Sequence, residues 1–286
     1  MNSYKEENYY LLLNYLILLY ATKFDYLKTN TLFLKYLDYL NQKIMNCIFI
    51  FDDKDKKIFS YVNESAIRSC TELIALNKEN ILFIYEHDWI WDIKTIEIPY
   101  VYFYKGNILL LNNKPIYINE SANANLFVDH ILNNKWTSII LFERKNQIFN
   151  TLYLNKKNYL NIIGISNLPI GFYHSNKLND LYDYISDNGL LITYVANFDF
   201  KVKRKLDKLV LGLFAKVLVF YFNGSINEFC QTIDIVYKNN NYPFIYRNSF
   251  DQVDSQLWID LKANYVNSTQ EVDNVNELVS FLKNTI

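Results

Sequence analysis

Short β-rich runs alternate with segments of helical periodicity from about residue 80 to the end of the chain. Strands that alternate with helices of 10–15 residues are typical of βαβ units. A run such as KVLVFYF (216–222) is apolar throughout, as expected of a parallel strand that is covered on both faces. The sequence therefore predicts an α/β fold, with an extended Rossmann-like, mainly parallel sheet and helices on both faces.

The expected strands all lie within this alternating part of the chain. They are ILFIY (81–85), YVYFY (100–104), PIYI (115–118), SIILF (138–142), LNIIGI (160–165), GLLITY (189–194), KVLVFYF (216–222), YPFIY (242–246) and NYV (264–266). The expected helices between and after them are 122–134, 175–187, 202–214, 225–239 and 271–284.

The first 79 residues have a different pattern, which predicts a small, mostly helical N-terminal unit ahead of a sheet domain over 80–286. Apolar residues recur at helical spacing in 7–21, and 30–43 and 64–77 are further expected helices. The runs CIFIF and KIFSY flank the charged turn DDKDKK (52–57) and suggest a β-hairpin.

Composition excludes several classes of function. The chain has 286 residues, 29 of them basic and 30 acidic, and this near-neutral balance argues against a protein that wraps duplex DNA. Cys47, Cys70 and Cys230 are far apart and fit neither a metal site nor a disulfide framework, so we expect buried, reduced thiols in a cytoplasmic protein. The run YYLLLNYLILLY (9–20) is too short for a spanning helix. Abundant Asn, Lys, Ile and Tyr suggest an AT-rich genome.

The sequence carries no motif of nucleotide or nucleophilic catalysis. No G-x-G-x-x-G, Walker lysine loop or G-x-S-x-G elbow occurs, and the three His residues are isolated from one another. We therefore expect no catalysis, no cofactor and no metal. Nucleotide hydrolysis, as in lysine decarboxylase-like proteins of related fold, is a weak alternative because the Pro-Gly-Gly-x-Gly-Thr stretch of those proteins is missing.

A basic cluster, KVKRKLDK (201–208), opens the expected helix 202–214. Its lysines could neutralise an anionic ligand, or they could form the solvated face of an ordinary helix. Whichever role the lysines have, the other face of this helix is predicted to pack in the core. Four apolar residues recur there at i, i+3, i+4 and i+7: Leu206, Leu209, Val210 and Leu213.

Several segments, in order, resemble the DNA-processing protein A (DprA/Smf) family of bacterial single-stranded DNA binders. The resemblance runs over about 80–275 and is clearest in NIIGISNLPIGFYHSNKLNDLYDYISDNGLLITYV (161–195). The matching residues are Pro99, Lys105, Gly106, Asn107, Ser121, Asn176, Leu178, Ile185, Gly189, Leu190, Leu191, Ile192, Tyr194, Lys208, Gly212, Leu213, Gly224, Ser225, Ala263, Val266 and Ser268. In this frame, residues 1–79 correspond to a SAM-like or helix-hairpin-like unit.

The chain also departs from the family pattern at the binding motifs. Glu120 and Ala122 replace the Gly and Arg of a Gly-Ser-Arg turn, and Leu206 and Asp207 replace the first Arg and the Asn of Arg-Asn-Arg. The stretch LFERKNQIFN (141–150) stands where the family has Ser-Gly-Leu-Ala-x-Gly-Ile-Asp. Thr193 replaces a Glu.

The resemblance implies a non-catalytic protein that binds single-stranded DNA at a basic strand-end surface and presents it to the RecA recombinase in DNA uptake and recombination. It further implies a homodimer. The residues it assigns to DNA binding are Ser121, Lys203, Arg204, Lys205, Lys208, Gly224 and Ser225. Ser121 and Gly224-Ser225 have an ordinary alternative role as helix N-caps. A degenerate scaffold that binds only protein partners is the alternative function.

Overall fold

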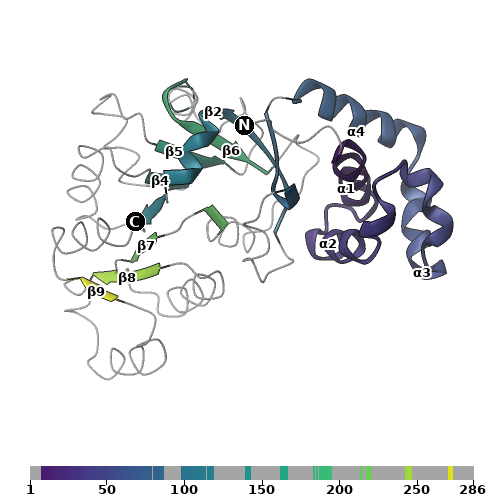
Figure 1. Cartoon of the computed structure of the whole chain (residues 1–286), viewed down its shortest axis with the longest axis horizontal. Helices are drawn as coiled ribbons and strands as arrows, with labels where there is room; N and C mark the ends of the chain where they lie inside the picture. Colours follow the sequence, from purple (N-terminus) through teal and green to yellow (C-terminus); the bar gives the residue numbers. More distant parts are fainter. Residues whose placement is uncertain are drawn as a thin grey trace. The chain divides into compact units, whose positions relative to one another are not determined.

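A computed structural model describes most of the N-terminal part of the chain and the strands that follow it (Figure 1). The described residues are 8–78, 80–86, 98–113, 115–118, 139–142, 162–166, 183, 185, 187–194, 213–214, 217–220, 242–246 and 270–272. The chain forms two compact units. One, the N-terminal unit, runs to Tyr104, and the other, the sheet unit, contains most of the chain from Lys105 onward.

The N-terminal unit is built around α1 (Tyr9–Ala21), which confirms the helix expected over 7–21. Residues Leu12–Leu19 are buried on every side of the helix, because α2 (Tyr26–Lys35), α4 (Glu64–Leu76) and the 3₁₀ segment Lys57–Tyr61 all contact it. The continuous apolar run 9–20 is therefore the sequence of a central helix. The helix expected over 64–77 is confirmed as α4, which Asn63 caps by accepting a hydrogen bond from the Ala66 N–H.

The helix expected over 30–43 was placed too late in the sequence. Asp25 is the N-cap of α2 and accepts a hydrogen bond from the Lys28 N–H, so the helix begins at Tyr26 and ends at Lys35. The chain then continues as short 3₁₀ turns, Leu37–Tyr39, Ile44–Asn46 and Ile48–Ile50.

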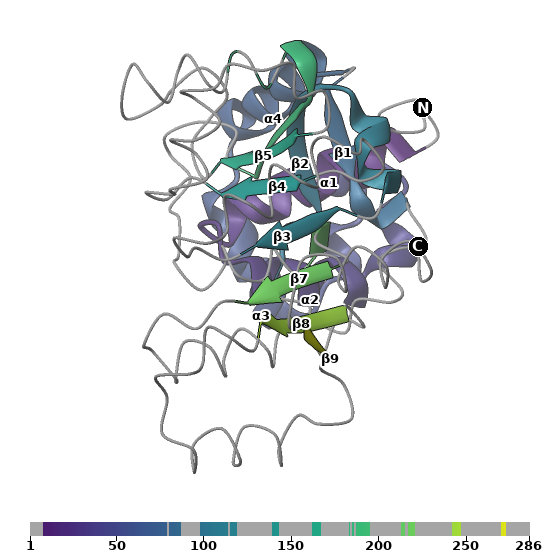
Figure 2. The same ribbon diagram turned by 90° about the vertical axis from the view of Figure 1, so that its left-hand side faces the viewer.

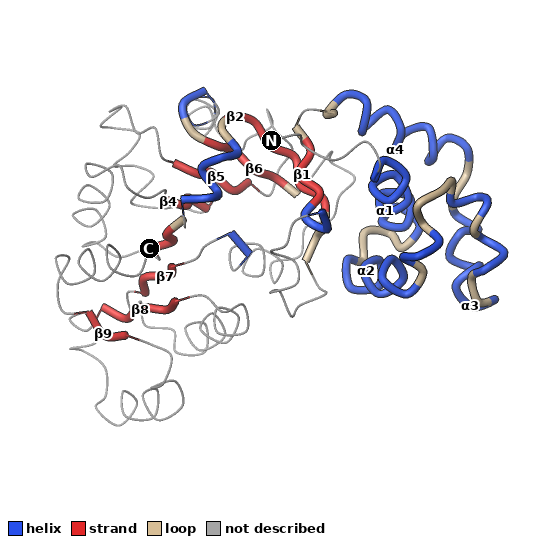
Figure 3. Tube along the Cα trace, viewed as in Figure 1, coloured by secondary structure: helices blue, strands red, loops and turns tan. Residues whose placement is uncertain are grey.

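The β-hairpin expected around 52–57 is wrong (Figure 3). Residues Asp53–Lys56 form the short helix α3, between the 3₁₀ segments Ile48–Ile50 and Lys57–Tyr61. Acidic and basic residues alternate in this turn, which begins with Asp53 and ends with Lys56, and that order suits the positive N-terminal and negative C-terminal ends of a helix. The apolar residues of the two supposed strands serve the core instead, since the Phe51 ring lies 4.0 Å from that of Tyr36 and 4.9 Å from that of Phe59.

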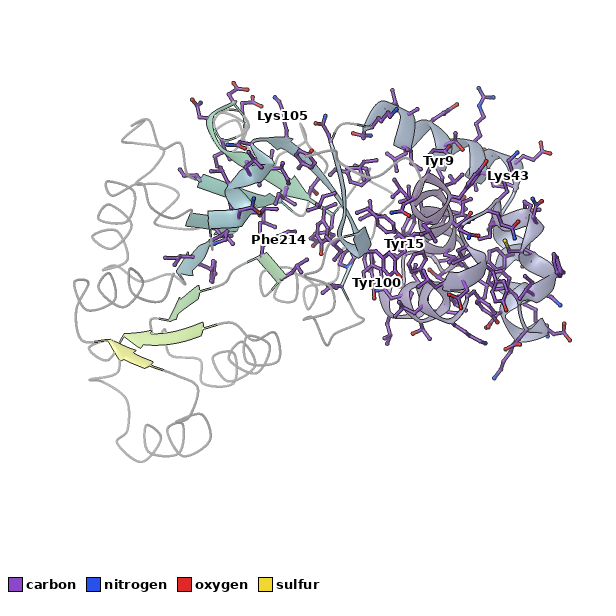
Figure 4. The ribbon with its side chains drawn as sticks, viewed as in Figure 1. Tyr9, Tyr15, Lys43, Tyr100, Lys105 and Phe214 are labelled. Carbon is purple, nitrogen blue, oxygen red and sulfur yellow. The ribbon has the colours of Figure 1, made fainter. Side chains whose placement is uncertain are left out.

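A buried polar contact joins the helices of this unit to its two strands, β1 (Ile81–Phe83) and β2 (Val101–Gly106), which pair antiparallel. The Tyr15 hydroxyl accepts from the Tyr100 N–H at 2.9 Å and donates to Asn30 Oδ1 at 2.9 Å. Asn30 Nδ2 then donates to the Ile98 carbonyl at 2.7 Å. Burial raises the pKa of Tyr15 well above its usual value, which keeps the hydroxyl proton available to donate. Figure 4 shows Tyr15 and Tyr100 beside each other.

Tyr15→Phe should therefore lower the free energy of unfolding by about 2–4 kcal/mol, because it removes the buried hydroxyl that accepts from the Tyr100 N–H and donates to Asn30 Oδ1. Urea unfolding followed by far-UV circular dichroism measures the change. Tyr20→Phe, at an exposed position of the same helix, is the matched control and should shift stability by less than about 0.5 kcal/mol. Equal shifts for the two variants would contradict this role of the Tyr15 hydroxyl.

The sheet unit has the α/β architecture expected from the sequence. Its strands are β3 (Ile116–Ile118), β4 (Ile139–Phe142), β5 (Ile162–Ser166), β6 (Leu190–Thr193), β7 (Val217–Phe220), β8 (Tyr242–Tyr246) and β9 (Gln270–Val272). Among the described residues the strand order is β6-β5-β4-β3-β7-β8-β9, and Figure 2 shows β5, β4, β3, β7 and β8 in succession. The recorded pairs from β5 to β9 are all parallel.

The first eight expected strands are confirmed, six of them as β3 to β8 of the sheet unit and the other two as β1 and β2. All described residues of β5 and β6 are buried, as expected of strands covered on both faces. The last strand differs. Residues 271 and 272 belong to β9, which pairs parallel to β8, whereas the sequence suggested that a helix begins at 271. The expected strand 264–266 lies outside the described residues.

Two glycines shape the start of β6, where a close backbone approach takes place. The Asn107 N–H donates to the Gly189 carbonyl at 2.8 Å, directly after Gly106, whose φ of 104° favours glycine. A Cβ at Gly189 would lie 2.3 Å from the Ile162 carbonyl oxygen, at the first residue of β5. Gly189 precedes β6, so this corner lies at the edge where β5 and β6 begin. The family-like residues Lys105, Gly106, Asn107 and Gly189 thus support the fold at the amino edge of the sheet.

Gly189→Ala should lower the free energy of unfolding by at least about 2 kcal/mol, because the added methyl group forces two backbone segments apart. Asp187→Ala is the matched control two residues away. Asp187 is exposed and lies 3.9 Å from the Lys105 ammonium, so its loss should cost less than about 0.5 kcal/mol. Chemical unfolding of both variants tests the prediction, and a Gly189→Ala variant as stable as Asp187→Ala would refute it.

Candidate nucleic-acid interface

The sheet unit reverses its direction of growth at β3. From β3 the chain adds β4, β5 and β6 on one side, and it then returns to add β7, β8 and β9 on the other. β3 and β7 are parallel neighbours, with Ile118 opposite Val219, so the two strands end at the same edge (Figure 2). In open α/β sheets, ligands bind beyond the carboxyl ends of the strands at such a switch point. This geometry makes the β3–β7 edge the candidate site.

The residues that the sequence assigns to DNA binding all lie outside the described residues: Ser121, Lys203, Arg204, Lys205, Lys208, Gly224 and Ser225. Their positions relative to the strands are nevertheless fixed along the chain. Ser121 comes three residues after Ile118, the last residue of β3, and Gly224 comes four residues after Phe220, the last residue of β7. The two segments thus follow the two strands that flank the switch point.

The carboxyl ends of β5 and β6 carry hydroxyl side chains that the sequence did not single out as site residues. Ser166 is the last residue of β5 and Thr193 the last residue of β6, and both are buried. Hydroxyl groups can donate and accept hydrogen bonds but cannot neutralise a phosphate. Charge for an anionic ligand would have to come from the segments that follow the strands.

The described residues offer neither a metal site nor an activated thiol. No group of three or more His, Cys, Asp or Glu side chains that could hold a metal ion occurs among them. Cys47 and Cys70 are free and buried, as expected, whereas Cys230 lies outside the described residues. Burial raises the pKa of Cys70 to about 11 and also raises that of Cys47, so both stay protonated and poorly nucleophilic at neutral pH.

In the same described part of the chain, none of the helices combines the length and the apolar character needed to cross a membrane.

The end of the expected helix 202–214 is described, and it is helical and buried. Leu213 and Phe214 have helical conformation and are both almost inaccessible to solvent. Leu213 is the last member of the predicted apolar stripe, so that member of the stripe faces the core. The basic cluster stands 5–10 residues earlier, at the start of the same expected helix.

Leu213→Ala should reduce the free energy of unfolding by about 2–4 kcal/mol through loss of buried surface and the cavity left behind. Leu109→Ala is the matched control in the same unit, since the Leu109 side chain is 53% exposed, and we expect a change below about 1 kcal/mol. Differential scanning calorimetry or urea unfolding gives both values. If Leu213→Ala were as mild as Leu109→Ala, the core role of this helix face would be wrong.

Comparison with known proteins gives matches at the level of structure alone. No family model and no curated protein sequence matches the chain. DNA processing protein A (DprA) from Streptococcus pneumoniae matches with a TM-score of 0.58 and 12% identity, over 92% of this chain and 95% of that one. DNA processing protein A from Helicobacter pylori, whose structure was described for its single-stranded DNA binding mode, matches with a TM-score of 0.53 and 12% identity. That match covers 69% of this chain and 93% of the other. The resemblance read from the sequence is confirmed in its fold.

Proposed function

From the DNA-processing protein A fold of this chain, we propose that it is a single-stranded DNA-binding protein that acts without catalysis. The observation that carries the proposal is the switch point between β3 and β7. The two segments assigned to phosphate contact, at Ser121 and at Gly224-Ser225, directly follow these two neighbouring parallel strands.

Chain connectivity limits how far these residues can lie from the switch point. Three residues reach at most about 11 Å from Ile118 to Ser121, and four reach about 14 Å from Phe220 to Gly224. Both segments lead into expected helices, 122–134 and 225–239. Backbone N–H groups at helix N-termini bind phosphate oxygens, and two such termini at one edge suit a phosphodiester backbone.

The positive charge in this proposal comes from Lys203, Arg204, Lys205 and Lys208. They lie within the connection between β6 and β7, 10–15 residues after Thr193, the last residue of β6. Binding to a single strand without base readout needs a basic track and has no need of a strongly basic protein. A net charge of −1 is therefore compatible with a local site.

The wider role follows from the family resemblance. We propose a cytoplasmic homodimer that presents single-stranded DNA to the RecA recombinase during DNA uptake and recombination. The altered Gly-Ser-Arg, Gly-Ile-Asp and Arg-Asn-Arg positions remove several phosphate donors. Binding in this chain would then depend more heavily on the lysines of the 203–208 cluster.

Replacing Lys203, Arg204, Lys205 and Lys208 together by Glu should weaken binding of a fluorescent oligonucleotide by roughly 100-fold at low salt. Each lost phosphate contact lowers the slope of log affinity against log salt by about 0.7, so the slope should fall by up to about 3. Fluorescence anisotropy titrations at several salt concentrations measure both quantities.

A charge-matched control reverses four exposed basic residues of the N-terminal unit instead: Lys28, Lys54, Lys57 and Arg68. This variant has the same net charge as the first and should keep most of the wild-type affinity. Equal losses in the two variants would place the effect in net charge and not in the 203–208 cluster. A wild-type chain that ignores oligonucleotides even at low salt would overturn the proposal and favour the degenerate scaffold.

A further inference from the structure

The dipeptide Asn188-Gly189 stands at the corner where β6 begins. The chain has six glycines, and two of them follow an asparagine, Gly189 and Gly224. In an Asn-Gly dipeptide the asparagine side chain reacts readily with its own backbone, because glycine has no Cβ to hinder the attack and its backbone turns freely. An intrinsically reactive bond therefore lies at a close approach of two backbone segments.

The reaction of such a dipeptide is an intramolecular displacement. The Gly189 nitrogen gives up its proton and attacks Cγ of Asn188, so that a C–N bond forms, the Cγ–Nδ2 bond breaks and ammonia leaves. Water then opens the resulting cyclic imide at either of its two carbonyls. One product is ordinary aspartate, and the other is isoaspartate, in which the main chain runs through Cγ. The reaction needs water alone and involves no oxidation or reduction.

The fold engages the nucleophile of this reaction in a hydrogen bond. The Gly189 N–H donates to the Ile185 carbonyl at 2.7 Å, and Asn188 itself has helical conformation. Ring closure requires the Gly189 nitrogen to turn toward the Asn188 side chain, so the backbone of Asn188 has to leave the helical range of ψ. That rotation, together with the loss of the proton, breaks the bond to Ile185.

The other side of the same peptide is also held in place. The Asn107 N–H donates to the Gly189 carbonyl at 2.8 Å, and Gly189 is buried. A Cβ on Gly189 would lie 2.3 Å from the Ile162 carbonyl oxygen, which leaves no room for the peptide to swing toward β5. The flanking Ile185 and Leu190 side chains are buried as well. The rotation that the reaction needs therefore requires this corner to unfold locally.

We propose that Asn188-Gly189 is a latent self-modification site, which reacts only when the corner opens and whose isoaspartate product prevents the corner from closing again. Isoaspartate adds one carbon to the main chain, next to a position where a single methyl group already meets backbone atoms. Ordinary aspartate leaves the main chain unchanged and alters only a half-buried side chain. This inference is independent of the proposed DNA site.

The first test compares deamidation of the full chain in native buffer and in concentrated urea, at the same mildly alkaline pH, by peptide mapping with mass spectrometry. Asn188 should react at least about 100-fold more slowly in native buffer, because opening of a buried corner is rare. In urea it should match Asn223, which also precedes a glycine and calibrates the unfolded rate. Equal rates for Asn188 in the two media, or no reaction at Asn188 in urea while Asn223 reacts, would overturn the proposal.

The second test asks whether the isoaspartate product blocks folding. The Asn223→Gln variant is aged in urea, so that Asn188 is its one remaining Asn-Gly site, and is then returned to native buffer. Size-exclusion chromatography separates folded from aggregated chain, and peptide mapping measures both products in each fraction. The isoaspartyl peptide should be depleted from the folded fraction by at least about tenfold relative to the aspartyl peptide, although both form from one imide.

Asn188→Asp is the matched control, because it carries the ordinary product on every chain, and it should refold like the wild type. Asn188→Gln keeps an amide but would need a larger ring, so deamidation at this position should disappear. Equal recovery of the two products in the folded fraction, or failure of Asn188→Asp to refold, would contradict a block caused by the altered main chain.

Discussion

The reversal of sheet growth at β3 is the constraint on which the sheet unit depends. β3 needs a parallel neighbour on each side, and the chain supplies β4 at once and β7 only about 100 residues later. Parallel neighbours cannot be joined by a tight hairpin and require crossover connections. In open α/β sheets such a reversal is the place where ligands bind, which is why the β3–β7 edge is the candidate site.

The N-terminal unit depends on a different constraint, because the middle of α1 is apolar on almost every side and has to be buried. α1 cannot sit on a surface, so α2, α4 and a 3₁₀ segment enclose it, and the aromatic rings of Tyr15, Phe33, Phe83 and Tyr100 fill the contact with the strands. Buried backbone groups at Ile98 and Tyr100 then need partners, which the side chains of Tyr15 and Asn30 provide. Hydrophobic burial drives the packing of the helices against the strands. The hydrogen bonds of Tyr15 and Asn30 fix the position of the helices along the strands.

The sequence was sufficient for β1 to β8, because each contains a run of apolar or aromatic residues bounded by polar ones, but it did not indicate β9, whose sequence is QEV. It was insufficient where the local composition of a segment favours one secondary structure and its packing in the folded unit requires another. CIFIF and KIFSY have the composition of strands. In the structure, however, Phe51 packs against Tyr36 and Phe59 in the core of the helical unit. The start of α2 depended on the Asp25 cap, which apolar periodicity does not reveal. For the candidate site, the sequence indicates which segments follow the strand ends, and the described fold makes two of those strands neighbours. Ser166 and Thr193 gave no signal, because isolated hydroxyl residues in a chain are common.

The corner at Gly106 and Gly189 has a consequence for how such proteins diverge. Steric exclusion there does not depend on any ligand, because an added methyl group meets a carbonyl oxygen whatever the protein binds. The departures from the family pattern at Glu120, Ala122, Leu206 and Asp207 do not fall at this corner. The restriction at Gly189 is thus set by the packing of one backbone segment against another, and it stays in force when binding motifs elsewhere in the chain change. In a chain that resembles a family only distantly, such a glycine is a better guide to the shared fold than a binding motif.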